Sequence, residues 1–558
     1  RVWNSENVYV SYNNCNVTGG GIAFELVGGD SAYVKNNVFV SNTGKAYSSS
    51  ISVTPHLFSD YNDLYSVSGN VGDWNGTTYQ TLSQWQSGTG YDINSMSITP
   101  QFVAPNNLHV LADTLDGAGI PIAGIFIDFD GNPRNATTPD IGADEIGANS
   151  NDAGIFTLFP QMPFARGMQN VKAVIRNYGG NTITSAEIHW KLNNVAQTTF
   201  NFSGSLPTLQ QDTVILGQVN FALSTPYTVK TWTAQPNGTE DLYNVNDTLT
   251  TSTLYAAVSD TLTIGGILPD LVNFSDALTA LSLGGVLDSV HFQIRNGTYH
   301  ALLTIPQTIG MSCTTPIIFE SESGNASSVI WDNMNLAGTT LVLNGADGIT
   351  LKNLTIKTVQ APYRAVEFGS GATCNTFFHC QLQGVTTTSS STAQAIVLST
   401  SSQDHNNHFI GNTFANGAYG LYWDGGGATT GAVIDNNLFQ NAYYAGFTVS
   451  QLGAPMISRN TVTSNTVYNY YTGINVNSCT DNTKIDANQI LLSGKRGIGL
   501  SIYACYGTTA LPLLASNNFI ILGNGTLSYG IQHVYGNYNN IYNNTVRING
   551  GDNTGLPY

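Results

Sequence analysis

Acidic residues gathered in one short segment are the first candidates for chemistry in this sequence. Five carboxylates and one arginine fall within the eighteen residues DFDGNPRNATTPDIGADE (residues 128–145), although charged residues make up only 9% of the chain. Carboxylates at this density are typical of a calcium site, of an acid–base pair in an enzyme, or of a structural plug around a buried ion pair.

The start of this segment, DFDGN, is similar to a calcium-binding loop. An EF-hand loop needs a ligand at position five and a glutamate at position twelve. Counted from Asp128, position five is Asn132 but position twelve is Pro139, which excludes that loop. We therefore favour a plug in which Arg134 pairs with Asp140 or Glu145, and otherwise expect no cofactor. A structural calcium ion is the alternative, with the ligands Asp128, Asp130, Asp140 and Glu145.

Tyrosines crowd the last third of the chain and are candidates for ligand binding. A tyrosine offers an apolar ring and a polar tip, which suits stacking on sugars or contact with proteins. The competing interpretation is that they fill strands, because tyrosine has a high β-propensity. The candidates for ligand binding are Tyr443, Tyr444, Tyr470, Tyr471, Tyr503 and Tyr535.

The elements that must position these residues are repeats. An asparagine followed by a short apolar strand recurs every 23 to 30 residues, at Asn412, Asn437, Asn460, Asn488, Asn518 and Asn544. Each copy is followed by a glycine and a second apolar strand. This period predicts a right-handed parallel β-helix, in which each repeat is one rung of a solenoid. Asparagine tolerates the left-handed backbone at a corner and can hydrogen-bond to the next rung, so this column is predicted to be structural.

Catalysis on a solenoid would need two acids in one column. Asp435 in IDNN and Asp486 in IDAN share a repeat position, and the repeat between them has ISRN with Arg459. The two carboxylates would stand two rungs apart, about 10 Å, a spacing compatible with an inverting glycosidase or a calcium pair. We favour the interpretation that Asp435 and Asp486 are solvated corner residues, and we therefore predict that the chain is not an enzyme.

The six cysteines suggest no catalysis or zinc site, because no CxxC motif occurs. Cys479 and Cys505 lie about one repeat apart and are predicted to stack, as a ladder or as a disulfide. Cys374 and Cys380 could close a small loop as a disulfide.

Three domains are predicted. Residues 1–147 repeat the pattern of an asparagine followed by a short apolar strand. They are predicted to form the last rungs and the closing segment of a first β-helix, truncated at its N-terminus. Residues 148–257 alternate apolar and polar positions in several short strands, which favours an immunoglobulin-like β-sandwich. Residues 258–558 form the second β-helix, truncated at its C-terminus, with a capping helix near 273–285 whose N-cap is expected to be Ser275.

The composition excludes some partners. The net charge of −17 argues against binding to nucleic acids or anionic membranes, which need basic residues. No run of eighteen apolar residues occurs, so direct membrane insertion is not expected. The chain starts at Arg1 without a signal peptide, which indicates a processed chain or an internal piece.

The segment 128–145 resembles the closing motif of modular right-handed parallel β-helix surface proteins secreted by Bacteroidetes-type bacteria. The pattern there is D-x-D-G-x-x-R followed by D-I-G-A-x-E. The matching residues are Asp128, Asp130, Gly131, Arg134, Asp140, Ile141, Gly142, Ala143 and Glu145. Residues 261–307 resemble the opening of such helices, and residues 151–257 resemble the adhesion-type sandwich modules between them.

This resemblance implies an extracellular, adhesin-like protein at the outer cell surface, exported by the type IX system. It also implies O-glycosylation where Asp precedes Ser or Thr and then a small or aliphatic residue. The candidate sites are Ser31, Thr114, Thr213, Thr248, Thr261 and Ser289.

The sequence thus predicts a structural or adhesive surface protein. Its partners would be glycans, other cell-surface proteins or further copies of itself. The alternative function is a polysaccharide-degrading enzyme, either a lyase or a glycoside hydrolase of the β-helix type.

Overall fold

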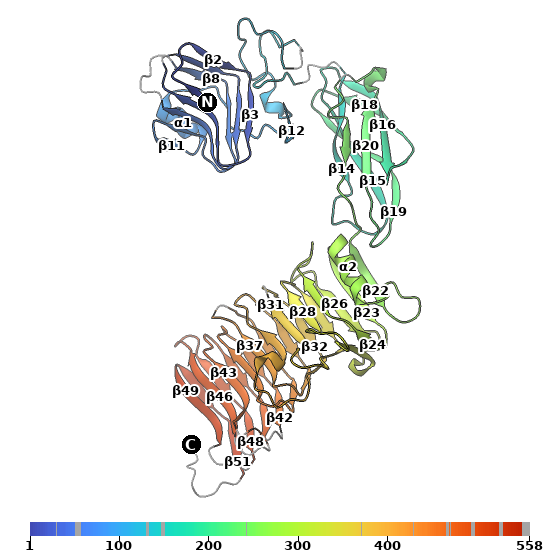
Figure 1. Cartoon of the computed structure of the whole chain (residues 1–558), viewed down its shortest axis with the longest axis vertical. Coiled ribbons are helices and arrows are strands. Elements are labelled where there is room, and N and C mark those ends of the chain that lie inside the picture. The colour runs from blue at the N-terminus through green and yellow to red at the C-terminus, as the bar shows by residue number, and fades with distance from the viewer. Residues whose placement is uncertain are drawn as a thin grey trace. The chain divides into compact units, whose positions relative to one another are not determined.

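The chain is an all-β protein built largely from a parallel β-solenoid, as the sequence predicts (Figure 1). The computed structural model describes residues 1–549, apart from 30, 51–56, 130–132, 147–150, 242, 370, 428, 465–467, 469, 493–496 and 524–527. Its α-helices are α1 (Leu82–Thr89) and α2 (Phe274–Gly284). Neither helix, nor any other in the described part of the chain, is long and apolar enough to cross a bilayer.

The chain divides into two compact units. The first unit comprises residues 1–160, 170–219 and 227–253, and the second comprises 161–169, 220–226 and 254–558. The boundaries between the three predicted domains therefore stay predictions, because the two units divide the chain differently.

The first unit begins with three short parallel sheets. Each sheet takes one strand from every rung, so the sheets form the sides of a solenoid (Figure 1). The first side consists of β2 (Val8–Ser11), β5 (Ala32–Lys35) and β8 (Leu57–Asp60). The second side consists of β3 (Asn14–Val17), β6 (Val38–Ser41) and β9 (Asp63–Ser66). The third side consists of β1 (Val2–Trp3), β4 (Ile22–Val27), β7 (Lys45–Ser50), β10 (Gly72–Trp74) and β11 (Thr77–Tyr79). The last pair, β10 and β11, is antiparallel, and α1 follows it.

Residues 153–250 form two sheets that contain antiparallel strand pairs. The first sheet has the order β14 (Ala153–Phe159), β15 (Gly167–Asn177), β19 (Gln211–Phe221); the second joins β16 (Ile183–Leu192) to β17 (Val195–Ala196), β18 (Phe200–Leu206) and β20 (Val229–Ala234), which pairs with β21 (Thr248–Thr250). The immunoglobulin-like assignment of this region stays a prediction.

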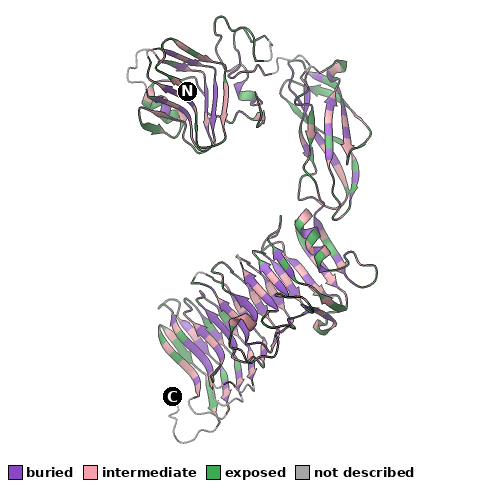
Figure 2. Ribbon diagram, in the orientation of Figure 1, coloured by how far each residue is buried: buried purple, intermediate pink, exposed green. Residues whose placement is uncertain are grey.

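The second unit is dominated by a longer solenoid with three parallel sheets. Their strand orders run from β22 (Val258–Ile264) to β50 (Asn539–Tyr542), from β24 (Gly297–His300) to β51 (Thr545–Ile548), and from β25 (Leu303–Pro306) to β49 (Tyr529–Asn537). Side chains from all three sheets meet in one continuous apolar core, and Figure 2 shows buried residues along the strands of this solenoid.

Helix α2 packs against the start of this solenoid. Its N-cap is Asn273, whose side chain accepts a 3.1 Å hydrogen bond from the backbone N–H of Asp276. The expectation that Ser275 caps the helix is therefore wrong, because the helix already begins at Phe274. The Phe274 ring is buried and stacks on Trp331 at 4.4 Å between centroids.

A ladder of buried asparagine side chains links the rungs. In the second solenoid, the Nδ2 of each asparagine donates to the Oδ1 of the next, at 2.8–3.0 Å, through Asn412, Asn437, Asn460, Asn488, Asn518 and Asn544. The same Oδ1 also accepts the backbone N–H of the preceding asparagine. The prediction that this column is structural agrees with these contacts.

A shorter ladder runs through the first solenoid, from Asn13 through Asn37 to Asn62, and ends on a carboxylate. Asp92 is fully buried and accepts hydrogen bonds from Asn62, Ser95 and the Nε1 of Trp85. Its carboxyl oxygens therefore receive the last amide donor of the ladder.

A column of glycines allows neighbouring rungs and the core side chains to approach closely on one side of the second solenoid. Gly420, Gly446, Gly473 and Gly499 occupy equivalent positions in successive rungs, and a Cβ at Gly473 would lie 2.6 Å from both the carbonyl of Gly499 and the Ile490 side chain. This close approach explains why a glycine follows each asparagine motif in the sequence.

The disulfide pattern differs from the prediction. Cys313 and Cys374 form the disulfide, with their Cα atoms 5.4 Å apart. A Cys374–Cys380 bond is thus wrong, because Cys380 points into the core and its thiol lies 3.3 Å from the carbonyl of Leu351. Cys479 and Cys505 are buried free thiols in neighbouring rungs, so the ladder form of that prediction agrees with the structure and the disulfide form does not.

Replacing Asn460 by alanine should destabilise the second solenoid by about 3 kcal/mol, because the donors and acceptors of its neighbours would be left buried and unpaired. Chemical denaturation of the full chain measures this loss. The matched control is Asn475→Ala, since Asn475 lies between the inward-facing Ile474 and Val476 and points outward. Equal losses for the two variants would contradict a special role for the ladder.

Candidate functional site

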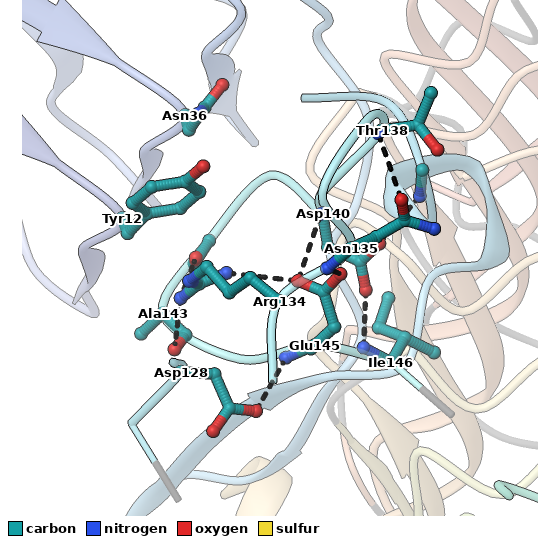
Figure 3. A network of polar contacts seen from close by, with 12 residues as sticks. Tyr12, Asn36, Asp128, Arg134, Asn135, Thr138, Asp140, Ala143, Glu145 and Ile146 are labelled. Atoms are coloured by element: carbon teal, nitrogen blue, oxygen red, sulfur yellow. Dashed lines mark hydrogen bonds and ion pairs between the residues drawn. The ribbon is translucent and has the colours of Figure 1, made fainter. Parts of the chain in front are cut away.

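The acidic segment 128–145 is organised around one buried arginine (Figure 3). The Nη1 of Arg134 donates to Glu145 at 3.2 Å, and its Nη2 donates to the carbonyls of Gly142 and Ala143 at 3.2 and 2.7 Å. The guanidinium also lies 3.8 Å from the centre of the Tyr12 ring. Of the two predicted partners of Arg134, the structure selects Glu145.

Asp128 and Asp140 accept backbone N–H groups. Asp128 accepts from Glu145 at 3.1 Å, and Asp140 accepts from Gly117 at 2.6 Å and from Ile146. Burial raises the pKa of Asp140 to about 8. The contacts are those of a plug that ties its own turns together.

A calcium site fits this arrangement poorly. The guanidinium of Arg134 already occupies the position beside Glu145 that a second cation would need. No group of three or more acidic, histidine or cysteine side chains suited to a metal is found among the described residues. Asp130, the fourth predicted ligand, lies outside the described residues, so calcium binding stays a prediction.

The plug is fastened to the first solenoid. The backbone N–H of Gly142 donates to the carbonyl of Asn36 at 2.9 Å, and that of Ala143 donates to the Oδ1 of Asn14 at 3.0 Å. The segment 134–146 thus holds the side formed by β3 and β6.

Replacing Arg134 by methionine should destabilise the first unit by about 3–5 kcal/mol, because Glu145 would remain as an uncompensated buried charge. Thermal unfolding, with hydrogen exchange of residues 134–146, measures the effect. The control is Lys45→Met, which breaks the more exposed Lys45–Asp73 pair at 3.0 Å and should cost below about 1 kcal/mol. A cost for Arg134→Met as small as that of the control would contradict the plug.

Asp63 is a further buried acid beside the closing region, and no pattern in the sequence indicated it. It begins β9 and is fully buried, with the Oδ1 accepting the N–H of Ile98 at 2.9 Å. The Oδ2 has no hydrogen-bond partner among the residues that the structure describes. Burial raises the pKa of Asp63 to about 7.

Stability should therefore depend on pH through Asp63. An unfolded aspartate has a pKa of about 3.9, so between about pH 4 and pH 7 the folded state binds more protons than the unfolded state. The free energy of unfolding then falls as the pH rises through this window, by up to about 4 kcal/mol. The Asp63→Asn variant should lack this part of the slope when denaturation is measured from pH 4 to 8. A variant with the same slope as the parent would contradict this.

The predicted acid pair lies in one column but does not form an acid–base pair. Asp435 (in β38, Val433–Asp435) and Asp486 (in β44, Lys484–Asp486) are in register with Ser458, which stands between them. In the intervening ISRN repeat, Ser458 takes the place of the acid, and Arg459, the next residue, forms an ion pair with Asp435. Its guanidinium lowers the pKa of Asp435, which makes Asp435 a poor general acid. Asp486 accepts from Ser516 at 2.6 Å.

Six tyrosine rings from three successive rungs meet at one edge of the second solenoid. We call them the tyrosine surface; they are Tyr419 and Tyr422 in β37 (Tyr419–Asp424), Tyr443 and Tyr444 before β40 (Ala445–Ser450), and Tyr468 and Tyr470 before β43 (Tyr471–Asn477). Neighbouring ring centroids lie 5.0–6.3 Å apart.

The tyrosine surface includes both buried and exposed rings. Tyr419 is buried and its hydroxyl donates to the carbonyl of Ser390 at 3.2 Å, whereas Tyr470 is 62% exposed. Burial, followed by the proximity of other tyrosines, raises the pKa of Tyr468. The phenol therefore stays protonated at neutral pH and keeps its hydrogen-bond donor.

The structure brings together only part of the predicted tyrosine set. Tyr443, Tyr444 and Tyr470 belong to the tyrosine surface. Tyr503 and Tyr535 form a separate exposed pair, 5.6 Å apart. Tyr471 is wrong as a ligand-binding residue, because it is 3% exposed and packs in the core.

Tyr419 and Tyr422 were absent from the predicted set. Strand alternation places Tyr422 on the face opposite the buried Leu421 and Trp423 and could have indicated its outward position, but it places Tyr419 on the same face as those core residues.

The predicted glycosylation sites are accessible. Ser31 is half-buried, and the other five are exposed: Thr114, Thr213, Thr248, Thr261 and Ser289. Their modification stays a prediction.

Comparison with known proteins supports the fold. The family model described as right handed beta helix region matches residues 394–556, so the chain contains a right-handed β-helix. No curated protein matches the chain.

Three solved structures show distant likeness. The Agl-KA catalytic domain is 12% identical, with 71% of each chain covered and a TM-score of 0.29. The Streptococcus pneumoniae surface protein and adhesin PfbA is 13% identical, with 52% of this chain and 98% of that chain covered and a TM-score of 0.24. The catalytic domain of GH87 alpha-1,3-glucanase, in complex with nigerose, is 10% identical, with 71% and 96% covered and a TM-score of 0.16. Likeness this low carries no argument about function.

Proposed function

We propose that this chain belongs to an extracellular structural or adhesive surface protein, whose second solenoid contacts glycans or other cell-surface molecules through the tyrosine surface. The observation that carries the proposal is the tyrosine surface itself. Tyrosine rings offer apolar faces for the C–H groups of a sugar and a polar tip that can hydrogen-bond to its hydroxyls.

Two further features support this location and role. The Cys313–Cys374 disulfide suits an oxidising, extracellular compartment. The asparagine ladders give the solenoid a rigid frame on which surface rings keep their spacing.

The finer architecture belongs to the same proposal. We infer two copies of one β-helix module with an immunoglobulin-like spacer between them, exported by the type IX system and carrying O-linked glycans. Self-association through solenoid faces is a further contact of the same kind.

The rival function is a polysaccharide-degrading enzyme. The column that holds Asp435 and Asp486 does not favour it, because Arg459 neutralises the first acid and Ser458 separates the two. Release of reducing ends or unsaturated sugars from a polysaccharide panel by the purified chain would overturn the adhesive proposal.

Replacing Tyr444 and Tyr470 together by serine should weaken binding to a responding glycan or cell surface at least tenfold, about 1.4 kcal/mol. Glycan arrays and cell-binding assays with the full chain measure this. The control is Tyr542→Ser, because Tyr542 is 50% exposed but lies on β50, outside the tyrosine surface. Binding that survives in the double variant, or that the control reduces equally, would contradict the proposal.

A further inference from the structure

An aromatic ladder stands on the outer face of the first solenoid. Tyr9, Tyr33 and Phe58 are in register in β2, β5 and β8. Their ring centroids lie 4.5 and 4.7 Å apart, and the planes are tilted by only 4° and 9°. The rings therefore stack face to face with the spacing of the rungs themselves.

The ladder stops at Phe58 and opens into a recess. The sheet that carries it has three strands, so no fourth strand brings another ring. The chain instead returns as residues 90–95, where the N–H of Asp92 donates to the carbonyl of Ser59 at 2.9 Å. A recess of about 290 Å³ remains, and Phe58, Lys35, Asp60, Tyr91 and Ile93 are among the residues that line it.

The lining of this recess is apolar on its faces and polar at its edge. Phe58 is 46% exposed and Ile93 is 62% exposed. Asp60 is engaged in holding the returning segment, because it accepts the N–H of Asn94 at 2.7 Å and the Nδ2 of Asn94 at 2.8 Å. The ammonium group of Lys35 forms no ion pair or hydrogen bond within the described part of the chain and is available to a ligand, whereas the backbone carbonyl of Lys35 accepts from Tyr12 and Asn37.

We propose that this recess binds one pyranose ring of a glycan, stacked on Phe58 as the fourth member of the aromatic ladder. A pyranose has an apolar face of C–H groups that matches the open face of Phe58, and it carries hydroxyl groups around its edge for Lys35. The volume admits one such ring and lies at the lower limit of ligand pockets. The site deepens the proposed function by adding a second glycan contact, but it rests on its own geometry and not on the tyrosine surface.

Two tryptophans contact residues that line the recess and can report on ligand binding by their fluorescence. The Nε1 of Trp85 donates to Asp92 at 2.9 Å, and the ring of Tyr91 lies 5.2 Å from that of Trp74. A ligand in the recess should therefore change tryptophan fluorescence.

The experiment titrates the full chain with methyl α- and β-pyranosides of glucose, galactose, mannose and glucuronic acid, and follows tryptophan fluorescence and calorimetry. We expect at least one probe to bind with a Kd near the millimolar range, about −4 kcal/mol. Phe58→Leu, which keeps an apolar side chain without the flat ring, should weaken it at least tenfold, and Phe58→Trp should retain it. Lys35→Met should weaken the glucuronide more than the neutral sugars.

The control is Tyr9→Leu, which shortens the same ladder at its other end and should leave binding unchanged. Binding of none of the probes overturns the proposal, as does binding that Phe58→Leu leaves intact or that Tyr9→Leu reduces equally. The Tyr444/Tyr470 double variant separates the two sites: if it lowers adhesion but not the fluorescence response, the recess acts independently, and if it removes the response, the recess is not the binding site.

Discussion

The rest of this fold depends on the hydrogen bonding of asparagine side chains between rungs. A parallel solenoid must bend its backbone at every corner, and each bend leaves N–H and C=O groups without a strand partner. The buried amide of an asparagine satisfies several of them at once, since Asn460 contacts Asn437, Asn488 and the carbonyl of Ile434. With the corners fixed, outward-facing residues keep the same position in every rung, and both aromatic surfaces follow from that regularity.

This dependence explains what could be predicted from the sequence. The asparagine repeat has a simple period, and the strands that follow it alternate, so the parallel β-helix was predictable in type and in the position of its corners. The closing segment was also predictable as a plug, because one arginine among several acids in a low-charge chain has few other roles. The exact partner of Arg134 was not, since Asp140 and Glu145 both lie within reach along the sequence.

Other parts of the site could not be derived from local patterns. Tyr470 and Tyr471 are adjacent, yet one is exposed and the other is in the core, because the strand β43 begins between them. The Cys374 partner was misassigned because proximity in sequence favoured Cys380, whereas the solenoid brings Cys313 from two rungs earlier. No sequence pattern indicated that Asp63 is buried, since nothing in its sequence context distinguishes a buried aspartate from a solvated one.

The ladder through Asn13, Asn37 and Asn62 has a direction. Each asparagine donates one amide proton to the next asparagine on the C-terminal side and accepts with its oxygen from the previous one, and the ladder in the second solenoid points the same way. The second amide proton, for example that of Asn37 or Asn460, goes to a backbone carbonyl of the preceding rung. Such a ladder is polar, so two ladders could join only where the donor end of one meets the acceptor end of the other. Asp92 stands at the end of the first ladder, where two carboxyl oxygens take the place of an amide and accept from Asn62, Ser95 and Trp85. The substitution of an oxygen for an amide nitrogen at this position therefore ends the ladder of amide donors, close to the point where the first solenoid meets its plug.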